Sequence, residues 1–252
     1  MSMRITFLGT GASEGIPVYG CRCPSCELAR MVPRYRRVPT SLLVQGGRDA
    51  LLIDVGTIRP ALYLSLNSDI ELHAILLSHW HHDHYAGLYV LRWSRKPLTL
   101  VHPPGGDPEI MQNPINIKKF IELKPYEKIT LGPFTIETIP LNHTVPTLGY
   151  LITGPRNKRV LTLFDTKLLD AEALDHVRGK PDIAIVDSTY SPGVNRPEHN
   201  NVDEAITLGS QVGPGETILT HVAHHNLPHN ELERYVTARG ATLSHDYMTI
   251  TL

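Results

Sequence analysis

The chain of 252 residues has little cysteine, no excess of either charge and no long apolar run. Lys and Arg number 24 against 25 Asp and Glu, so the sequence offers no overall basic footprint for a nucleic-acid backbone. The longest apolar runs, such as 74–77 and 51–53, are far shorter than the roughly 20 residues of a membrane helix. These absences favour a protein that acts on a small substrate and that neither binds a membrane nor forms a stable complex with nucleic acid.

The three cysteines, Cys21, Cys23 and Cys26, all lie within one short stretch. Since no distant cysteine exists, a disulfide cannot join separate parts of the chain, and the clustering predicts metal ligands. Three thiolates lack one ligand of a closed tetrahedral zinc site, which a histidine from elsewhere could complete. We therefore expect a structural zinc loop at about residues 20–27.

The N-terminus enters a strand-like run at 4–8 without the charged leader, apolar stretch and cleavage site of a secretory signal. We expect a cytoplasmic protein. The sequence does not decide between a monomer and a homodimer.

The composition, with 41% apolar and 19% charged residues, suits a chain that buries a sizeable core. Short aliphatic and β-branched runs alternate with helix-compatible segments, which predicts an α/β layered fold in one domain over 1–252. The segment 103–114, rich in Pro and Gly, is expected to be an irregular surface excursion. The predicted strands are 4–8, 41–44, 51–54, 74–78, 98–101, 135–139, 160–164, 183–186 and 217–220, and the predicted helices are 61–66, 87–93, 170–177, 202–212 and 231–239.

Polar residues that could bind a ligand fall where predicted strands stop. They are Asp54, His79, Asp165, Asp187 and His221. Layered α/β sheets bind ligands at this end of their strands. The sequence therefore predicts a site there, with Asp187 interpreted as a support for ligands or a cap rather than a ligand.

The densest motif is His79-x-His81-x-Asp83-His84, which follows a predicted strand and precedes a helix start near Gly87. A tight turn there can direct several ligands to one point. Imidazole and carboxylate together suit zinc, manganese or iron. Accidental clustering is the alternative in a chain with 14 histidines, but the strand, the spacing and the aspartate favour a metal site.

This motif resembles the H-x-H-x-D-H pattern of the metallo-β-lactamase fold superfamily, whose later ligand positions are matched in order by His143, Asp165 and His221. The resemblance implies a four-layer αββα sandwich with two divalent metals, Mn²⁺ or Zn²⁺. It assigns His79, His81 and His143 to one metal, Asp83, His84 and His221 to the other, Asp165 to both, and Asp54 to orienting the ligands. Taken singly, His143 is also compatible with a turn, Asp165 with a helix cap and His221 with a strand end.

Two positions direct the resemblance toward hydrolysis. The superfamily's oxygen-reducing diiron members carry glutamate where this chain has His81, and many true β-lactamases carry cysteine where it has Asp165. Two metals roughly 3.5 to 4 Å apart can clamp a phosphoryl group and activate a water. The prediction is hydrolysis of a phosphoester, with Asp83 as a catalytic candidate.

With the cysteine cluster added, the whole pattern resembles PhnP-like cyclic phosphodiesterases of the carbon–phosphorus lyase pathway. In that family a histidine three positions beyond the last active-site histidine completes the structural zinc, which implies His224, although His225 and His229 lie nearby. The resemblance also implies His199 as a general acid. It implies conversion of 5-phosphoribosyl 1,2-cyclic phosphate to ribose 1,5-bisphosphate in phosphonate catabolism, with nucleoside 2′,3′-cyclic phosphates as alternative substrates.

Two rival functions stay open at the level of sequence. A tRNase Z-like RNA endonuclease uses a similar motif but needs an RNA-binding surface, for which Arg34, Arg36 and Arg37 are the candidates. A PqqB-like protein of cofactor biosynthesis combines this fold with a similar cysteine loop and acts chiefly in binding, but the full hydrolytic ligand set disfavours it.

Overall fold

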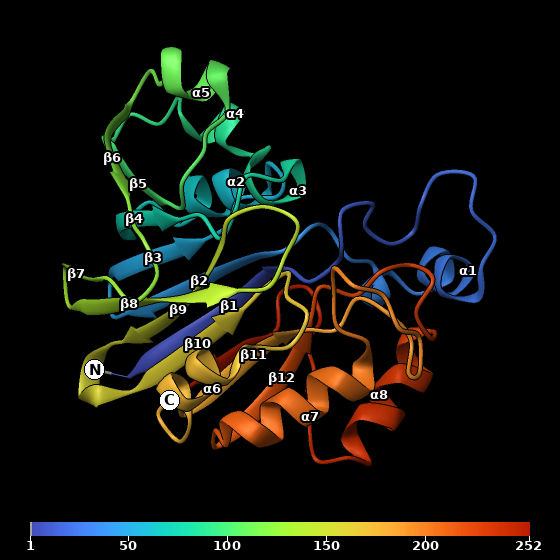
Figure 1. The fold of residues 1–252 in the computed structure, drawn as a ribbon. Helices are drawn as coiled ribbons and strands as arrows, with labels where there is room; N and C mark the ends of the chain where they lie inside the picture. The colour runs from blue at the N-terminus through green and yellow to red at the C-terminus, as the bar shows by residue number, and fades with distance from the viewer. Residues whose placement is uncertain (1) are drawn as a thin grey trace.

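Residues 2–252 of the computed structural model form two seven-stranded sheets that pack face to face (Figure 1). Both sheets mix parallel and antiparallel pairs. The first sheet has the order β14 (Thr249–Thr251), β1 (Met3–Gly9), β2 (Ser41–Gly46), β3 (Asp49–Ile53), β4 (Glu71–Leu76), β5 (Leu98–His102) and β6 (Ile117–Glu122). The second has the order β13 (Thr242–Leu243), β12 (Glu216–Thr220), β11 (Ile183–Asp187), β10 (Arg159–Leu163), β9 (Thr147–Thr153), β8 (Phe134–Leu141) and β7 (Lys128–Leu131).

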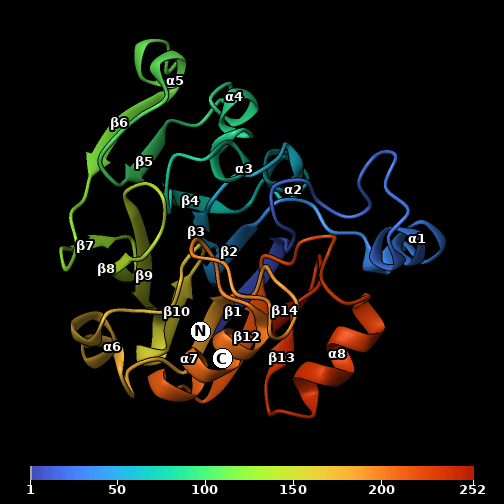
Figure 2. The ribbon, with the colours of Figure 1, turned by 45° about the vertical axis from the view of Figure 1, so that its right-hand side comes forward.

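Helices cover the outer face of each sheet (Figure 1). On the side of the first sheet lie α2 (Arg59–Leu66), α3 (His82–Tyr85), α4 (Leu88–Leu91) and α5 (Pro108–Gln112), and on the side of the second lie α6 (Ala171–Val177), α7 (Val202–Val212) and α8 (His229–Thr237). Two short 3₁₀ helices, Pro33–Tyr35 and Pro155–Asn157, lie in connections. The helix α1 (Pro24–Met31) lies beside the sandwich, on the same side as α8 (Figure 2).

Alternation along the strands produces the layers. In β11, Ile183 and Ile185 belong to the apolar cluster between the sheets, whereas Ala184 and Val186 belong to the cluster under α6, α7 and α8. Successive side chains of a strand point to opposite faces, so a strand buried on both faces is apolar throughout. A third cluster, which includes Leu52 of β3, lies under α2 and α4. The predicted α/β class and four-layer αββα arrangement are confirmed.

The structure contains all nine predicted strands, and α7 has the predicted bounds. Its ends were readable because Asn201 and Glu204 form a capping box and Gly213, with φ 66°, ends the helix. The sequence reading missed α1, α3 and the strands β6, β7, β9, β13 and β14, and all of these strands except β9 are edge strands. Two of these, β6 and β7, carry exposed polar residues that break an apolar run.

The prediction for 103–114 was wrong in part, because this segment contains α5. Asp107 precedes the helix and accepts a hydrogen bond from the Ile110 N–H at 2.9 Å, and Pro108 occupies the first turn. Both are ordinary helix-start signals that the abundance of Pro and Gly obscured. Within residues 2–252, every helix is too short or too polar to cross a membrane.

Candidate metal centre

The turn after β4 carries the central motif and is fixed by close backbone packing. The Val55 N–H donates to the His84 carbonyl at 2.7 Å, and the Gly87 N–H donates to the Val55 carbonyl at the same distance. A Cβ on Gly56 would lie 2.2 Å from the Asp83 carbonyl oxygen, and one on Gly87 would lie 2.0 Å from the Thr57 oxygen. Only glycine fits at either position, so these two residues let α3 sit directly against the sheet.

The other predicted ligands come from three loops at strand ends: His143 follows β8, Asp165 follows β10 and His221 follows β12. Asp165, His221 and also Asp54 have positive φ values of 50°, 58° and 57°. Such left-handed backbone is uncommon for residues other than glycine and concentrates at functional sites. Here it turns each side chain back toward the ends of the strands.

The structure brings these residues together as two groups that share Asp165. One group contains His79, His81, His143 and Asp165, and the other contains Asp83, His84, Asp165 and His221, with the ligand atoms of each group within 4.8 Å of one another. Asp165 places Oδ2 3.2 Å from His84 Nε2 and 3.5 Å from His79 Nε2, and Oδ1 3.2 Å from His221 Nε2. These are the two sets that the sequence resemblance implies, and a shared carboxylate is suited to bridging two cations.

Four buried atoms at this place test whether metal ions fit. Within residues 2–252, Nε2 of His79, His84 and His221 and Oδ1 of Asp165 have no hydrogen-bond partner. Buried polar atoms are normally paired, because an unpaired one costs free energy. Atoms of these types, directed at one another across two small clusters, fit divalent cations.

The protonation tendencies agree with ligand roles for His79, His81, His143 and Asp165, whereas at His84 and His221 the charge of Asp165 outweighs burial and raises the pKa, so a cation would have to displace a proton there. Burial lowers the pKa of His79 well below its usual value and also lowers the pKa values of His81 and His143, which keeps these imidazoles neutral. Burial opposes ionisation of Asp165, but the surrounding histidines, His221 foremost, outweigh it and hold its pKa well below the usual range. Neutral imidazole and ionised carboxylate are the forms that bind metals.

A layer of hydrogen bonds holds the candidate ligands from behind. Asp54 is fully buried, and its Oδ2 lies 2.7 Å from His84 Nδ1 while it also accepts from the Ser78 hydroxyl. This placement matches the orienting role predicted for Asp54. Such carboxylate–histidine pairs fix the ring that presents the other nitrogen to a metal.

Asp187 is outside both sets of predicted ligands; it lies in a third group, with Asp165, His199 and His221, and there it holds His199. Its Oδ2 lies 2.7 Å from His199 Nδ1, and its Oδ1 accepts from the Thr189 hydroxyl at 2.6 Å. The His199 ring stacks on His221 with centroids 5.3 Å apart. Burial opposes protonation of His199, but the Asp187 carboxylate outweighs it and raises the pKa of His199 to about 9.

The sequence reading left the segment after Asp187 unassigned, yet the structure places it at the site. Thr189 Oγ1 lies 2.9 Å from His221 Nδ1, and Tyr190 lines the same cavity. The Glu198 carbonyl oxygen lies 2.9 Å from His143 Nδ1. Their position directly after β11 or beside His199 was the available signal, but none of the three residue types alone indicates a supporting role.

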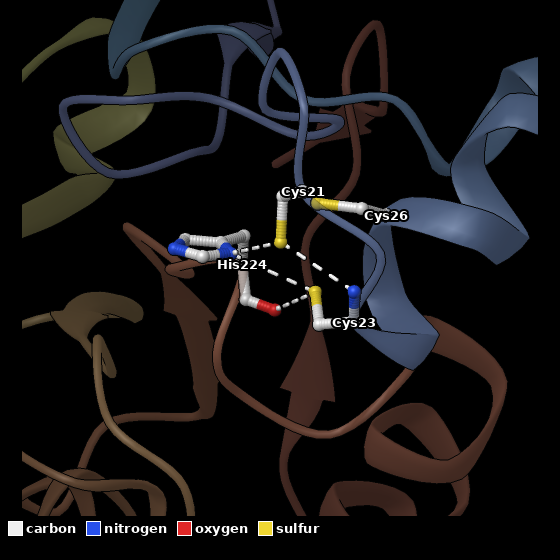
Figure 3. A group of neighbouring side chains, drawn as sticks. All are labelled: Cys21, Cys23, Cys26 and His224. Atoms are coloured by element: carbon white, nitrogen blue, oxygen red, sulfur yellow. Dashed lines mark hydrogen bonds between the residues drawn. The ribbon is translucent and has the colours of Figure 1, made fainter.

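The cysteine loop and His224 form a second candidate metal site (Figure 3). The thiols of Cys21, Cys23 and Cys26 and the His224 ring lie within 4.8 Å of one another, with His224 Nδ1 3.4 Å from the Cys21 sulfur and 3.6 Å from the Cys23 sulfur. Three thiols and one imidazole fit a closed tetrahedral zinc site. His225 is not in this group, and its ring faces Tyr190 at 5.2 Å instead.

The thiol environment differs along the loop. Hydrogen bonds from Cys23, the backbone N–H above all, lower the pKa of the Cys21 thiol to about 7, whereas burial raises the pKa of Cys26 to about 12. Cys21 is therefore disposed to ionise near neutral pH, as a metal-binding thiolate must.

Comparisons with known proteins agree with this geometry. An octanoyltransferase of Porphyromonas gingivalis is 30% identical over 245 residues, which make up 91% of this chain and 48% of that relative, so the chain spans about half of its length. The crystal structure of a new diphosphatase from the PhnP family superposes with a TM-score of 0.84 at 25% identity, covering 100% of this chain and 98% of that one. The fold is also similar to that of Zn²⁺-bound PqqB from Methylobacterium extorquens, with a TM-score of 0.82, 21% identity and coverage of 99% and 100%.

The model of the beta-lactamase superfamily domain matches residues 46–222, from β2 to the loop after β12. It therefore includes every candidate ligand of the two groups that share Asp165, which are together called the paired site below. The similarity to the PhnP family extends over the whole chain. The chain therefore belongs to the beta-lactamase superfamily, with the metallo-β-lactamase fold, and is PhnP-like within it.

Proposed function

We propose that this chain is a metal-dependent phosphodiesterase that opens a five-membered cyclic phosphodiester of ribose. One observation carries the proposal: two groups of ligands share Asp165 at a cavity of about 450 Å³, and His199 lines the same cavity. A phosphodiester bound there would lie between the shared carboxylate and a positioned acid. The volume suits a small substrate.

Two divalent cations held by these groups would supply positive charge to the phosphate oxygens and would lower the pKa of a water that attacks phosphorus. The protein's own contribution is placement. Asp165 fixes the spacing of the two groups, Asp83 and His84 enter from the rigid α3 turn, and Asp54 holds the His84 ring. Such preorganisation leaves little rearrangement for the reaction itself.

His199 is the proposed general acid. Its Nδ1 is engaged by Asp187, so proton donation falls to Nε2. The raised pKa of His199, about 9, keeps the ring protonated near neutral pH, as a group that protonates a leaving oxygen must be. Opening of the ring would then leave a phosphomonoester and a free hydroxyl.

Two substrates of this class follow from the proposal: 5-phosphoribosyl 1,2-cyclic phosphate, which would place the chain in phosphonate catabolism, and nucleoside 2′,3′-cyclic phosphates. The endonuclease rival is weakened because only part of its candidate patch is free: Arg34 and Arg36 are exposed, but Arg37 is not. Arg37 is buried and bonds to Thr10 and His229, and Arg36 donates to the Ala29 carbonyl.

A parallel assay tests the function. Metal-replete protein is offered 5-phosphoribosyl 1,2-cyclic phosphate, 2′,3′-cyclic nucleotides and a precursor tRNA. Turnover of a cyclic phosphodiester supports the proposal, and cleavage of the tRNA alone overturns it. Metal analysis separates the binding-protein rival, because a hydrolase should hold about three metals per chain, two at the paired site and one zinc at the cysteines. A chain that holds only the cysteine-bound metal would favour binding.

A further inference from the structure

The ring of His79 is held from behind by a hydroxyl group. Ser78 Oγ lies 3.0 Å from His79 Nδ1 and 2.7 Å from Asp54 Oδ2, and all three residues are buried. His84 Nδ1 is also 3.4 Å from this oxygen, but it lies closer, at 2.7 Å, to Asp54. A carboxylate only accepts hydrogen bonds, so the hydroxyl donates to Asp54 and its oxygen accepts from the His79 ring. The hydrogen of the neutral ring is therefore on Nδ1, and the lone pair is on Nε2, which faces Asp165.

The same arrangement recurs in the second sheet, in the loops after β11 and β12. Thr189 Oγ1 lies 2.9 Å from His221 Nδ1 and 2.6 Å from Asp187 Oδ1, again among buried residues. The His221 carbonyl oxygen, at 3.1 Å, is a longer alternative for the hydroxyl hydrogen. With either acceptor, the Thr189 oxygen is left to accept from Nδ1 of the ring. His221 Nε2, which faces Asp165 at 3.2 Å, can then offer its lone pair once a cation has displaced its proton.

Asp187 holds two rings at once. Its Oδ1 reaches His221 through Thr189, while its Oδ2 lies 2.7 Å from His199 Nδ1. The two rings stack with centroids 5.3 Å apart and an angle of 14° between their planes. Because both Nδ1 atoms are directed at one carboxylate, both Nε2 atoms face away from it, and both residues line the cavity. The distance between the proposed acid and this candidate ligand therefore depends on the Thr189 hydroxyl.

We propose that Ser78 and Thr189 are positioning residues, one for each cation of the paired site. Each hydroxyl fixes the orientation of one histidine and keeps the ring hydrogen on Nδ1, so that Nε2 is available to a cation. Ser78 acts on the group that contains His79, and Thr189 acts on the group that contains His221. Thr189 has a second role, because it also fixes the spacing between His221 and His199.

Metal titration tests the two roles separately. Thr189→Val keeps the shape of the side chain and removes the hydroxyl, and we expect the affinity of the group around His221 for Zn²⁺ to fall by about 10- to 100-fold, as is typical when the partner of a metal-bound histidine is lost. The other group should change less, and Ser78→Ala should give the reverse pattern. Titration with Zn²⁺ against a competing chelator measures each binding step. His81→Ala and Asp83→Asn, each changing a ligand of one group only, identify which step belongs to which group.

Thr189→Ser provides the control, because it keeps the hydroxyl and removes only the methyl group. It should recover most of the affinity that Thr189→Val loses. An affinity as low as that of Thr189→Val would show that packing and not the hydroxyl matters, and would overturn the inference. Unchanged affinities in Thr189→Val, or equal losses at both groups, would also overturn it. The cysteine site, whose step Cys23→Ser identifies, is a reference that should not change in these variants.

Imidazole NMR spectra of the zinc-loaded protein show which ring nitrogen carries the hydrogen. For His221 we expect a hydrogen on Nδ1 that exchanges slowly with water, because the ring is buried, and we expect this signal to be lost in Thr189→Val. Ser78→Ala should have the same effect on the His79 ring. A role in packing alone would leave these signals in place. A His221 ring without hydrogen on Nδ1 in the unmodified protein would overturn the inference.

The kinetics of the metal-saturated variants test the second role of Thr189, and this part rests on the proposed phosphodiesterase function. We expect kcat of Thr189→Val to be at least about tenfold below that of Ser78→Ala, with similar KM values, because only the first change alters the spacing between His199 and the cations. Equal kcat values would overturn this role. Absence of turnover by the unmodified protein on every cyclic phosphodiester would instead overturn the proposed function, while the metal titration still decides the roles of both hydroxyls.

Discussion

Single side chains at the paired site divide into those that would hold cations and those that hold other side chains. Asp165 faces four imidazole nitrogens directly, whereas Asp54 and Asp187 each hold one histidine through Nδ1. All three aspartates are buried. The three residues have the same side chain, so their different roles depend only on which atoms each carboxylate contacts. A carboxylate between two groups of ligands can bridge two cations, whereas one that contacts a histidine Nδ1 orients that ring.

His199→Gln separates proton transfer from metal binding. We expect turnover to fall by roughly 10²- to 10⁴-fold, as is typical when a general acid is lost. Metal content should stay at the level of the unmodified protein, since His199 is outside the two sets of predicted ligands and its Nδ1 is held by Asp187, although it lies in a further group with Asp165, Asp187 and His221. Kinetics and metal analysis on the same preparation provide the check. Loss of metal would reassign His199 as a ligand.

Among the elements, the cysteine loop and α1 lie beside the sandwich (Figure 2) and are tied to the loop after β12 through His224 (Figure 3). The Glu14 carboxylate also accepts from the His224 N–H at 3.2 Å. A zinc held here would thus fasten α1 to the segment that carries His221.

Cys23→Ser should remove the link that a zinc ion would make between α1 and the loop after β12. We expect about one metal fewer per chain and a lower thermal midpoint, by roughly 2–4 °C for each kcal/mol of stability lost in a chain of this size. Differential scanning calorimetry with metal analysis measures both. Arg22→Gln, in the same loop but outside the ligand group, is the matched control. An unchanged metal count in Cys23→Ser would contradict the proposed zinc site.

The start of α8 contains a buried histidine that should make stability depend on pH. The His229 ring stacks on Tyr35 at 4.4 Å, and the Arg37 guanidinium lies 3.0 Å from its Nδ1. Burial first, and then the charges of Arg37 and His245, lower the pKa of His229 to about 3, although Glu233 approaches its Nε2 to 4.0 Å. The folded protein therefore keeps this ring neutral.

In the unfolded chain the pKa of this histidine is about 6.5. Between pH 6.5 and about 3 the unfolded state binds a proton that the folded state does not, so stability falls as the pH drops through this window. We expect His229→Gln to lose less stability than the unmodified protein between pH 7 and pH 5. Urea unfolding at both pH values measures the difference, and equal losses would show that His229 stays protonated in the fold.

At the scale of the whole molecule, one buried hydrogen bond links the sheets next to the paired site. Tyr150, in β9, is fully buried and donates from its hydroxyl to the Leu77 carbonyl at 2.6 Å, just before His79. Tyr150→Phe leaves that carbonyl without this donor and should lower the free energy of unfolding by about 1–3 kcal/mol. Denaturant unfolding tests this, with Tyr19→Phe at a fully exposed position as the control. Similar effects of the two changes would contradict it.

The strands of the core were predictable because both of their faces are buried. The run at 183–186 is apolar at every position since alternate residues serve two different clusters. Edge strands such as β14 were not predictable, because Thr249 and Thr251 are exposed and the strand exists only through its pairing with β1. Local sequence cannot record a partner that lies more than 240 residues away.

For the site, the sequence by itself showed the dense motif at 79–84 and polar residues at strand ends, because strand periodicity and metal chemistry are both local properties. The order of the later candidate ligands was implied by the family resemblance. Tertiary structure decided which of these residues lie close together. It placed Asp165 between the two groups, put His224 rather than His225 beside the cysteines, and gave His225 and Tyr190 a shared wall of the cavity. These facts depend on loops from distant strands converging in space, and spacing along the chain does not encode that distance.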